Sequence, residues 1–209
     1  IGLESRENVK IMRKKSSNNF FYLPNWVNLK EFKKNKIKNK KKYNFIFAGN
    51  IGGGQDIDKV LKFYTLIPDE ILDKFYVVGD GITSYKIKKN KRQKTGKKII
   101  FKSKLSQGNY IKFLEKMDFG IVSINDKIQS VNFPGRLFSY LMANKPVILL
   151  TEKNNELSRF VKSNKIGINI SNRNLSLNKF MGIKKINKKL IKNDFYIYNF
   201  LKRNFSLSK

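Results

Sequence analysis

The chain has 209 residues, no cysteine, no histidine and a formal net charge of +30 at pH 7. This composition excludes disulfides, thiolate nucleophiles, the usual zinc sites and histidine acid–base chemistry within the chain. The 45 Lys and Arg residues against 15 Asp and Glu favour a solvated lysine surface, and they leave phosphate-bearing ligands, nucleic acid and anionic lipid open as partners. No apolar run approaches the ~18 residues of a membrane-spanning helix.

The N-terminal stretch predicts a helix, a stop and a short strand. Leu3–Lys15 carries spaced apolar residues among charges, which is typical of an amphipathic helix, and Ser16–Asn19 ends it. Phe20–Leu23 is apolar and is followed by Pro24, so it predicts a short strand. Lys33–Lys42 is rich in Lys and Asn and predicts a solvated linker or loop.

From Tyr43 onward, predicted strands and helices alternate regularly. The predicted strands are Tyr43–Ala48, Phe75–Val78, Ile99–Phe101, Phe119–Ile124, Pro146–Leu150 and Ile166–Ile170. The predicted helices begin near Asp56 and Thr83 and cover Tyr110–Lys116, Pro134–Ala143 and Asn155–Ser163. This alternation requires crossovers, so we expect an α/β fold with a doubly wound, parallel, Rossmann-like sheet of about six strands. Ligands of such sheets bind at the carboxyl ends of the strands.

The C-terminal stretch is more polar. Ser171–Lys192 is rich in lysine with weak helical signals, whereas Asp194–Phe205 has the spacing of an amphipathic helix. Such a basic helix either packs against the domain, which we favour, or lies on a membrane. We therefore predict three parts: residues 1–19 as a helix and linker, 20–170 as the Rossmann-like domain, and 171–209 as a basic, weakly helical segment.

Gly49–Gln55 is a glycine-rich turn between a predicted strand and a predicted helix. Glycines there permit a positive φ and close approach of a ligand, and the following helix start offers N–H donors to phosphate. The turn lacks the Gly-Lys-Ser/Thr of a P-loop and the order of the dinucleotide motif, so phosphate binding and tight packing both remain open. Gly79–Gly81 predicts a second turn, with Asp80 as a cap of the next helix.

Arg136 is the best single candidate for an anion-binding cation. Pro134 suits the start of a helix, which places Arg136 in the first turn, beside free N–H groups and the positive end of the helix dipole. The sequence contains no motif that would pair Asp118 with Asp126 as catalytic carboxylates.

The helix that begins near Pro134 has two distinct faces. The helical period predicts a buried face formed by Leu137, Phe138, Leu141 and Met142, and an opposite face formed by Arg136, Ser139, Tyr140 and Ala143.

Several of these motifs, in this order, resemble one known family. The motifs are Tyr22–Asn28, Phe45–Gln55, Val78–Gly81 and Pro134–Ile148. Together they resemble the C-terminal, nucleotide-sugar-binding half of retaining GT-B glycosyltransferases of family 4. The subgroup they resemble makes bacterial O-antigen and capsule sugars and includes the fucosamine transferases.

The resemblance implies a nucleotide-diphosphate sugar, UDP-linked, as donor substrate, with no cofactor and no metal. The diphosphate would lie against the first glycine-rich turn and the start of the late helix, and the nucleoside near the end of the third strand. Ser139 stands where many members have a glutamate that holds the ribose, and Val131 where they have another. The catalytic residues are not assigned, and the implied donor-binding residues are Gly49, Asn50, Gly52, Gly53, Gly54, Gln55, Lys104, Leu105, Gly135, Arg136 and Ser139.

The implied activity is transfer of a hexose or N-acetylhexosamine to a lipid-linked saccharide in cell-surface polysaccharide synthesis. The implied location is the cytoplasm, including the inner face of the membrane. Leu3–Lys15 would be the last helix of a preceding acceptor domain, without which we expect weak activity or none. The alternatives are a GT-B protein similar to UDP-N-acetylglucosamine 2-epimerase and a non-catalytic basic module that binds anionic membrane or, less favoured, nucleic acid.

Overall fold

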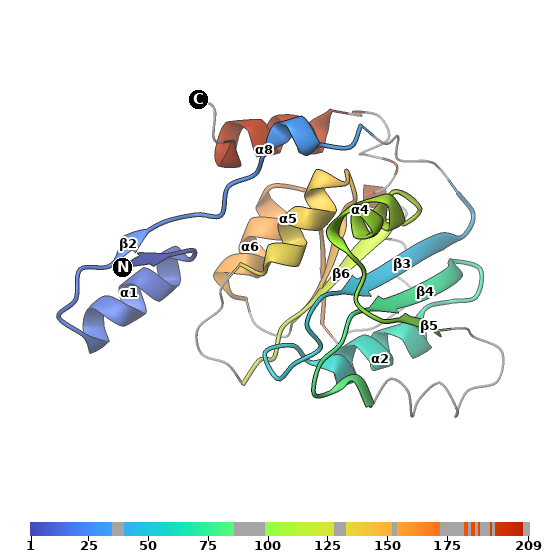
Figure 1. Cartoon of the computed structure of the whole chain (residues 1–209), viewed down its shortest axis with the longest axis horizontal. Coiled ribbons are helices and arrows are strands. Elements are labelled where there is room, and N and C mark those ends of the chain that lie inside the picture. Colours follow the sequence, from blue (N-terminus) through green and yellow to red (C-terminus); the bar gives the residue numbers. More distant parts are fainter. Residues whose placement is uncertain are drawn as a thin grey trace.

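The structure is a computed structural model and describes residues 1–34, 40–85, 99–127, 133–151, 154–171, 182–183, 185–186, 188, 193 and 195–206. Six parallel strands form the central sheet (Figure 1). They are β3 (Tyr43–Ala48), β4 (Leu72–Val78), β5 (Ile99–Lys102), β6 (Phe119–Ser123), β7 (Val147–Leu150) and β8 (Gly167–Ile170). Their order is β5-β4-β3-β6-β7-β8, with every pairing parallel, which confirms the predicted doubly wound sheet. The order reverses between β3 and β6, so the crevice expected to take a ligand lies at their carboxyl ends.

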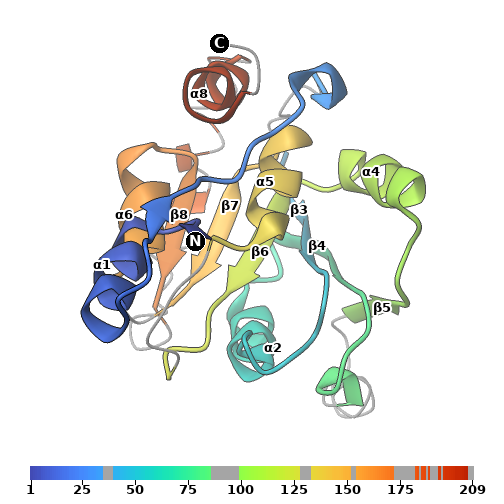
Figure 2. The ribbon, with the colours of Figure 1, turned by 60° about the vertical axis from the view of Figure 1, so that its left-hand side comes forward.

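Helices cover both faces of the sheet (Figure 2). One face carries α2 (Ile57–Leu66), and the other carries α4 (Gln107–Glu115), α5 (Gly135–Met142) and α6 (Glu156–Ser163). Side chains of a strand alternate between faces. Phe45 and Phe47 of β3 accordingly pack toward α2, and Ile46 and Ala48 pack toward α5. The apolar strand runs of the sequence are therefore explained by burial on both sides.

The C-terminal helix α8 (Tyr196–Phe205) lies over α5 and α6 (Figure 1). Its Ile197 and Leu201 are buried, and the rings of Phe138 and Phe205 meet edge to face with centroids 5.0 Å apart. The N–H of Val27, which precedes the short 3-10 helix η1 (Leu29–Glu31), donates to the carbonyl of Phe205 at 2.8 Å. The favoured expectation, that this helix packs against the domain, is confirmed.

The face prediction for α5 is wrong at two residues. Tyr140 and Ala143, expected on the face opposite the buried one, are 0% and 3% exposed. Tyr140 is in fact directed at the sheet, because its ring lies against Gly120 of β6 and its hydroxyl accepts the Ala48 N–H of β3, whereas Ala143 is buried in the same core as Val27. The helix ends as predicted, because Asn144 takes a left-handed φ of 56° and Lys145 N–H donates to the Tyr140 carbonyl at 2.9 Å.

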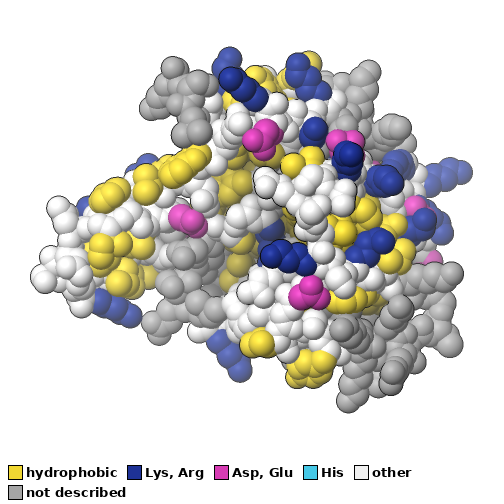
Figure 3. Space-filling model, in the orientation of Figure 1, with side chains coloured by type: hydrophobic (Ala, Val, Ile, Leu, Met, Phe, Trp, Pro, Cys, Tyr) yellow, Lys and Arg dark blue, Asp and Glu magenta, His cyan; other side chains and the backbone are white. Residues whose placement is uncertain are grey.

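The N-terminal residues form a separate strand–helix–strand unit beside the main sheet (Figure 1). The strands β1 (Gly2–Leu3) and β2 (Phe21–Tyr22) pair in parallel, with α1 (Arg6–Lys15) between them, so the prediction of a helix already at Leu3 is wrong. A two-residue strand depends on its partner and has no local signature. Figure 3 shows hydrophobic side chains gathered over this unit, where Ile1 and Phe21 are more than half exposed.

The helices α1 and α6 meet at their N-termini. The carboxylate of Glu156 accepts the N–H groups of Arg6 and Glu7 at 3.1 and 2.8 Å and the hydroxyl of Ser5 at 2.7 Å. The carboxylate of Glu7 in turn accepts the N–H of Glu156 at 3.1 Å and pairs with Arg159. Each glutamate satisfies N–H groups that the other helix leaves free, and each offsets the positive end of that helix.

The predictions for Val131, for the helix beyond Tyr85 and for most of Ser171–Lys192 lie outside the described residues. In the part of the chain that is described, no helix combines the length and the hydrophobicity that crossing a membrane requires.

Candidate functional site

The loops at the carboxyl ends of β3, β4, β5 and β6 are joined by hydrogen bonds of backbone N–H groups, most of them to backbone carbonyls. Gly49 N–H donates to Val78 O at 2.9 Å, and Ile51 N–H donates to Asp80 O at 2.9 Å. Lys104 N–H, after β5, donates to the Asp80 carboxylate at 3.0 Å. The Asp80 side chain thus links two loops, whereas the sequence predicted that it would cap a helix.

Two glycines permit this close contact between the first two loops. An ideal Cβ on Gly79 would lie 2.0 Å from Gly49 O, and one on Gly81 would lie 2.4 Å from Ile51 O. Both residues also have positive φ, at 133° and 156°. The Gly79–Gly81 turn is therefore explained by packing against the glycine-rich loop.

The glycine-rich loop, residues 49–55, uses its glycines differently from the expectation. Gly49 has the positive φ, 112°, and the three consecutive glycines do not. Around Gly53 and Gly54 an added Cβ would meet no atom within 4 Å, so this stretch stands open. Among described residues, the N–H groups of Gly52, Gly53 and Gly54 have no hydrogen-bond partner. They are available as donors to an anion.

Arg136 extends from the first turn of α5 over this loop. Its guanidinium carbon lies 4.8 Å from the centroid of the Phe47 ring, and its Nη2 donates to Asn50 O at 3.2 Å. Its Nη1 is buried and has no hydrogen-bond partner among the described residues. Burial lowers the pKa of Arg136, but a guanidinium remains protonated at neutral pH. An unsatisfied buried donor costs about 1–3 kcal/mol, or more when charged, and a bound anion would remove that cost.

Two tyrosines that the sequence did not identify as site residues stand beside Arg136. The Tyr140 hydroxyl accepts the Ala48 N–H at 2.9 Å, at the end of β3, and burial raises its pKa to about 12. Tyr110 of α4 hydrogen-bonds to Tyr140, and burial raises its pKa as well. Gly120 provides the space, because an added Cβ would lie 2.2 Å from the Tyr140 ring. A glycine inside a strand was the available signal for such an approach.

The other predicted residues lie around this centre. Ser139 is one turn beyond Gly135 on α5, and its hydroxyl donates to Gly135 O at 3.3 Å. Both residues line a groove of about 250 Å³ between α4 and α5, together with Tyr110. Leu105 is half-buried and packs on the same side of the sheet as α4, whereas Lys104 is exposed.

Gln55 and Asn50 take different positions in the loop. Gln55 N–H closes the turn onto Gly52 O at 3.1 Å, and its side-chain Oε1 is buried with no partner among the described residues. Asn50 is exposed, and its carbonyl receives Arg136. The structure therefore brings the glycine-rich loop and Arg136 together, as the sequence predicted.

A buried lysine beneath the loop was also missed. Lys59 of α2 is 8% exposed, and its Nζ donates to Ile124 O at 2.9 Å and pairs with Asp126. The Thr151 hydroxyl donates to the same carboxylate at 2.7 Å. Asp126 and Asp118 are thus engaged separately, Asp118 with Lys40 and the Asn44 N–H at the opposite end of the sheet. The expectation that these aspartates form no catalytic pair agrees with this arrangement.

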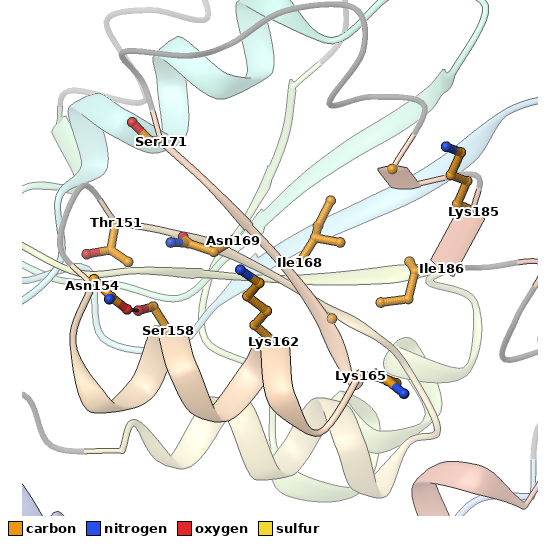
Figure 4. Close-up of a pocket in the computed structure, with 12 residues that line it drawn as sticks. Thr151, Asn154, Ser158, Lys162, Lys165, Ile168, Asn169, Ser171, Lys185 and Ile186 are labelled. Carbon is orange, nitrogen blue, oxygen red and sulfur yellow. Dashed lines mark hydrogen bonds between the residues drawn. The ribbon is translucent and has the colours of Figure 1, made fainter.

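A larger hollow of about 650 Å³ lies along the edge strand β8, against α6 (Figure 4). Lys162, Lys165 and Lys185 contribute to its described lining, beside the polar side chains of Thr151 and Asn169. None of the predicted donor-binding residues is among that lining. It is therefore distinct from the site at Arg136.

Comparison with known proteins identifies the fold. No family model matches the chain. Over 142 residues it is 24% identical to the "Probable glycosyltransferase WbjE" of Pseudomonas aeruginosa, an alignment that covers 68% of this chain and 34% of that protein. The lipopolysaccharide outer core galactosyltransferase WaaB superimposes with a TM-score of 0.69 at 13% identity, over 98% of this chain and 57% of that one.

Anabaena Alr3699/HepE, solved in complex with UDP and glucose, gives a TM-score of 0.65 at 9% identity, over 98% of this chain and 58% of that one. The chain spans about a third of the curated relative and under two thirds of these solved chains. Its architecture is that of one Rossmann-like half of a GT-B glycosyltransferase.

Proposed function

We propose that this chain is the donor-binding half of a retaining family 4 glycosyltransferase, close to the fucosamine transferase subgroup. It would transfer a hexose or N-acetylhexosamine from a UDP-linked donor to a lipid-linked saccharide in O-antigen or capsule synthesis. One observation carries the donor site: the buried, unpartnered Nη1 of Arg136 at the glycine-rich loop. The names of WbjE and WaaB support the transferase activity, and the UDP bound to Alr3699/HepE supports the nucleotide.

The residues at the site suit departure of a diphosphate. As the bond between the sugar and the diphosphate breaks, negative charge develops on the leaving diphosphate. Arg136 supplies a fixed positive charge, and the open N–H groups of Gly52, Gly53 and Gly54 supply neutral donors. Charge-assisted and preorganised donors contribute most where charge develops, so this site would lower the barrier to transfer.

The nucleoside would extend from the diphosphate into the groove between α4 and α5. Ser139 lines that groove in place of the family's ribose-binding glutamate, and Tyr110 faces the same space. A serine hydroxyl and a tyrosine ring offer hydrogen bonding and stacking but no carboxylate. We therefore expect weaker donor binding than in family members with the glutamate.

A second α/β domain would complete the enzyme and hold the acceptor. The strands β1 and β2 form a parallel pair of two residues each, whereas parallel sheets are ordinarily larger and covered on both faces. Ile1 and Phe21 of this unit are 58% and 51% exposed, and Leu23 beside it is 44% exposed. These exposed side chains suit burial against further strands of a second sheet. Without that domain we expect weak activity or none, and the enzyme would work in the cytoplasm or on the inner face of the membrane.

Titration calorimetry of the chain against UDP, UDP-sugars and single-stranded RNA tests the donor site. We expect saturable UDP binding that Arg136→Ala weakens by about 10- to 150-fold, the equivalent of one charge-assisted hydrogen bond. Arg159→Ala is the matched control, because Arg159 is an arginine of α6 that pairs with Glu7. It should leave UDP affinity unchanged. Salt-sensitive RNA binding with no UDP signal would instead support the nucleic-acid alternative.

A further inference from the structure

Asn125, two residues beyond the end of β6, is hydrogen-bonded to the glycine-rich loop through both its backbone and its side chain. Its N–H donates to Gly54 O at 3.3 Å, and its Nδ2 donates to Gly53 O at 3.0 Å. Its Oδ1 accepts the N–H of Lys127 at 3.0 Å, which directs the amide nitrogen toward Gly53. One asparagine thus binds two successive carbonyls of the loop.

These contacts orient the loop peptides. The C=O and N–H of a trans peptide point in opposite directions, and the described part of the chain has no cis peptide. Because Gly53 O points toward Asn125, the N–H of the same peptide, that of Gly54, points away from β6 toward the open side of the loop. No side chain fixes this stretch, and glycine is the most flexible residue, so an external contact must hold it.

Asn125 is itself held on both sides. The carbonyl of Ile124 accepts Lys59 Nζ at 2.9 Å, and the carboxylate of Asp126 pairs with the same ammonium and accepts the Thr151 hydroxyl. The Ser123 hydroxyl donates to the carbonyl of Asp56 at 2.9 Å. The segment around Asn125 is therefore fixed to α2 and to the end of β7, which makes it a rigid support.

We propose that Asn125 is a positioning residue for the donor diphosphate, because its side-chain amide holds the Gly53–Gly54 peptide with its N–H turned to the anion. This inference rests on the proposed function. It assigns the orientation of the loop donors to Asn125, whereas Arg136 supplies the charge.

The test compares how wild type and Asn125→Ala bind UDP and uridine, in NMR titrations of the whole chain. Uridine lacks the phosphates, so it reports the nucleoside contacts alone. We expect Asn125→Ala to weaken UDP binding about tenfold, as loss of one oriented donor predicts, and to leave uridine affinity within about twofold. Asn125→Asp keeps the acceptor for Lys127 N–H and loses the donor to Gly53, so it should weaken UDP binding at least as much.

The matched control is Asn204→Ala, which removes a similar bond from Asn204 Nδ2 to Phe200 O, 2.8 Å long, on α8. It should change neither affinity. A parallel loss of UDP and uridine binding in Asn125→Ala would show a merely structural role and overturn the proposal, as would wild-type UDP affinity in either Asn125 variant. Failure of the wild-type chain to bind UDP would overturn the proposed function itself.

Discussion

We expect removal of the Tyr140 hydroxyl to destabilise the fold, by an amount that follows from its contacts. It accepts the N–H of Ala48, the last residue of β3, at 2.9 Å, and both residues are at most 1% exposed. Tyr140→Phe keeps the ring in its place over Gly120 and removes only this acceptor. The Ala48 N–H then stays buried without a partner, and Tyr110 loses its hydrogen bond as well.

The expected cost follows from that unsatisfied donor. A buried N–H that loses its acceptor costs about 1–3 kcal/mol. For a chain of this size each kcal/mol lowers Tm by about 2–4 °C, so the whole effect is about 2–12 °C. Gly49, the first residue of the glycine-rich loop, directly follows Ala48, and the Gly49 N–H donates to Val78 O. Because a disturbance at Ala48 reaches this residue, we expect Tyr140→Phe to lower UDP affinity as well as stability.

Urea unfolding followed by circular dichroism measures the effect. Tyr198→Phe is the control, since Tyr198 packs edge to face on Phe32 with centroids 5.2 Å apart and makes no hydroxyl hydrogen bond to a described residue. That control should stay within about 0.5 kcal/mol of wild type. If Tyr140→Phe unfolds at the same urea concentration as Tyr198→Phe, the Ala48 N–H does not depend on the Tyr140 hydroxyl for its hydrogen bond and the reasoning is wrong.

Three further predictions concern stability, each measured by urea unfolding. Burial raises the pKa of Tyr140 from 10.0 to about 12, so the protonated hydroxyl stabilises the fold fully below pH 10, and this stabilisation is lost as the pH rises to 12. Between pH 10 and 12 the wild type should therefore lose stability more steeply than Tyr140→Phe. Burial alone would raise the pKa of Glu156, but hydrogen bonds led by the Glu7 N–H hold it below its usual 4.5. Glu156→Gln should therefore cost about 1 kcal/mol at pH 7, and equal stabilities at pH 7 would contradict the mutual capping; the difference should vanish as pH falls below 4.5. Gly79→Ala should lower the free energy of unfolding by about 3 kcal/mol, because its Cβ would meet Gly49 O at 2.0 Å. Gly108→Ala on α4, with open space around it, should instead raise the free energy of unfolding by about 0.5–1 kcal/mol. A similar effect of the two substitutions would contradict the packing role of Gly79.

The sequence predicts the main sheet well, because buried parallel strands leave strong local signals. Val147–Leu150 and Tyr43–Ala48 are short apolar runs, and each is separated from the next strand by a helix. The strand β1 leaves no such signal, since Gly2–Leu3 pairs only with residues about twenty positions later. Tyr140 was placed on the wrong face because the prediction assigned only apolar residues to the buried side, whereas this tyrosine reaches the sheet at Gly120 and its hydroxyl finds a partner in the Ala48 N–H.

The candidate site also contains residues that the sequence identifies and residues that it does not. Arg136 and Gly49–Gln55 are recognisable from residue type and position, at a helix start and in a strand–helix turn. Asn125 and Lys59 are not, because their roles depend on bonds to carbonyls of other loops, and any residue supplies a carbonyl. Sequence reasoning finds the groups that would touch a ligand more readily than the groups that hold them.

The charge of the chain and the charge of the site are separate matters. Most of the 45 Lys and Arg residues can be solvated, and an exposed ammonium loses little when no anion is near. Arg136 differs because part of its guanidinium is buried with no acceptor among the described residues, beside backbone donors that also lack acceptors. Such a group has a free-energy reason to bind an anion, and the diphosphate that we propose would offer it charged acceptor oxygens. The net charge of +30 alone would suit any polyanion.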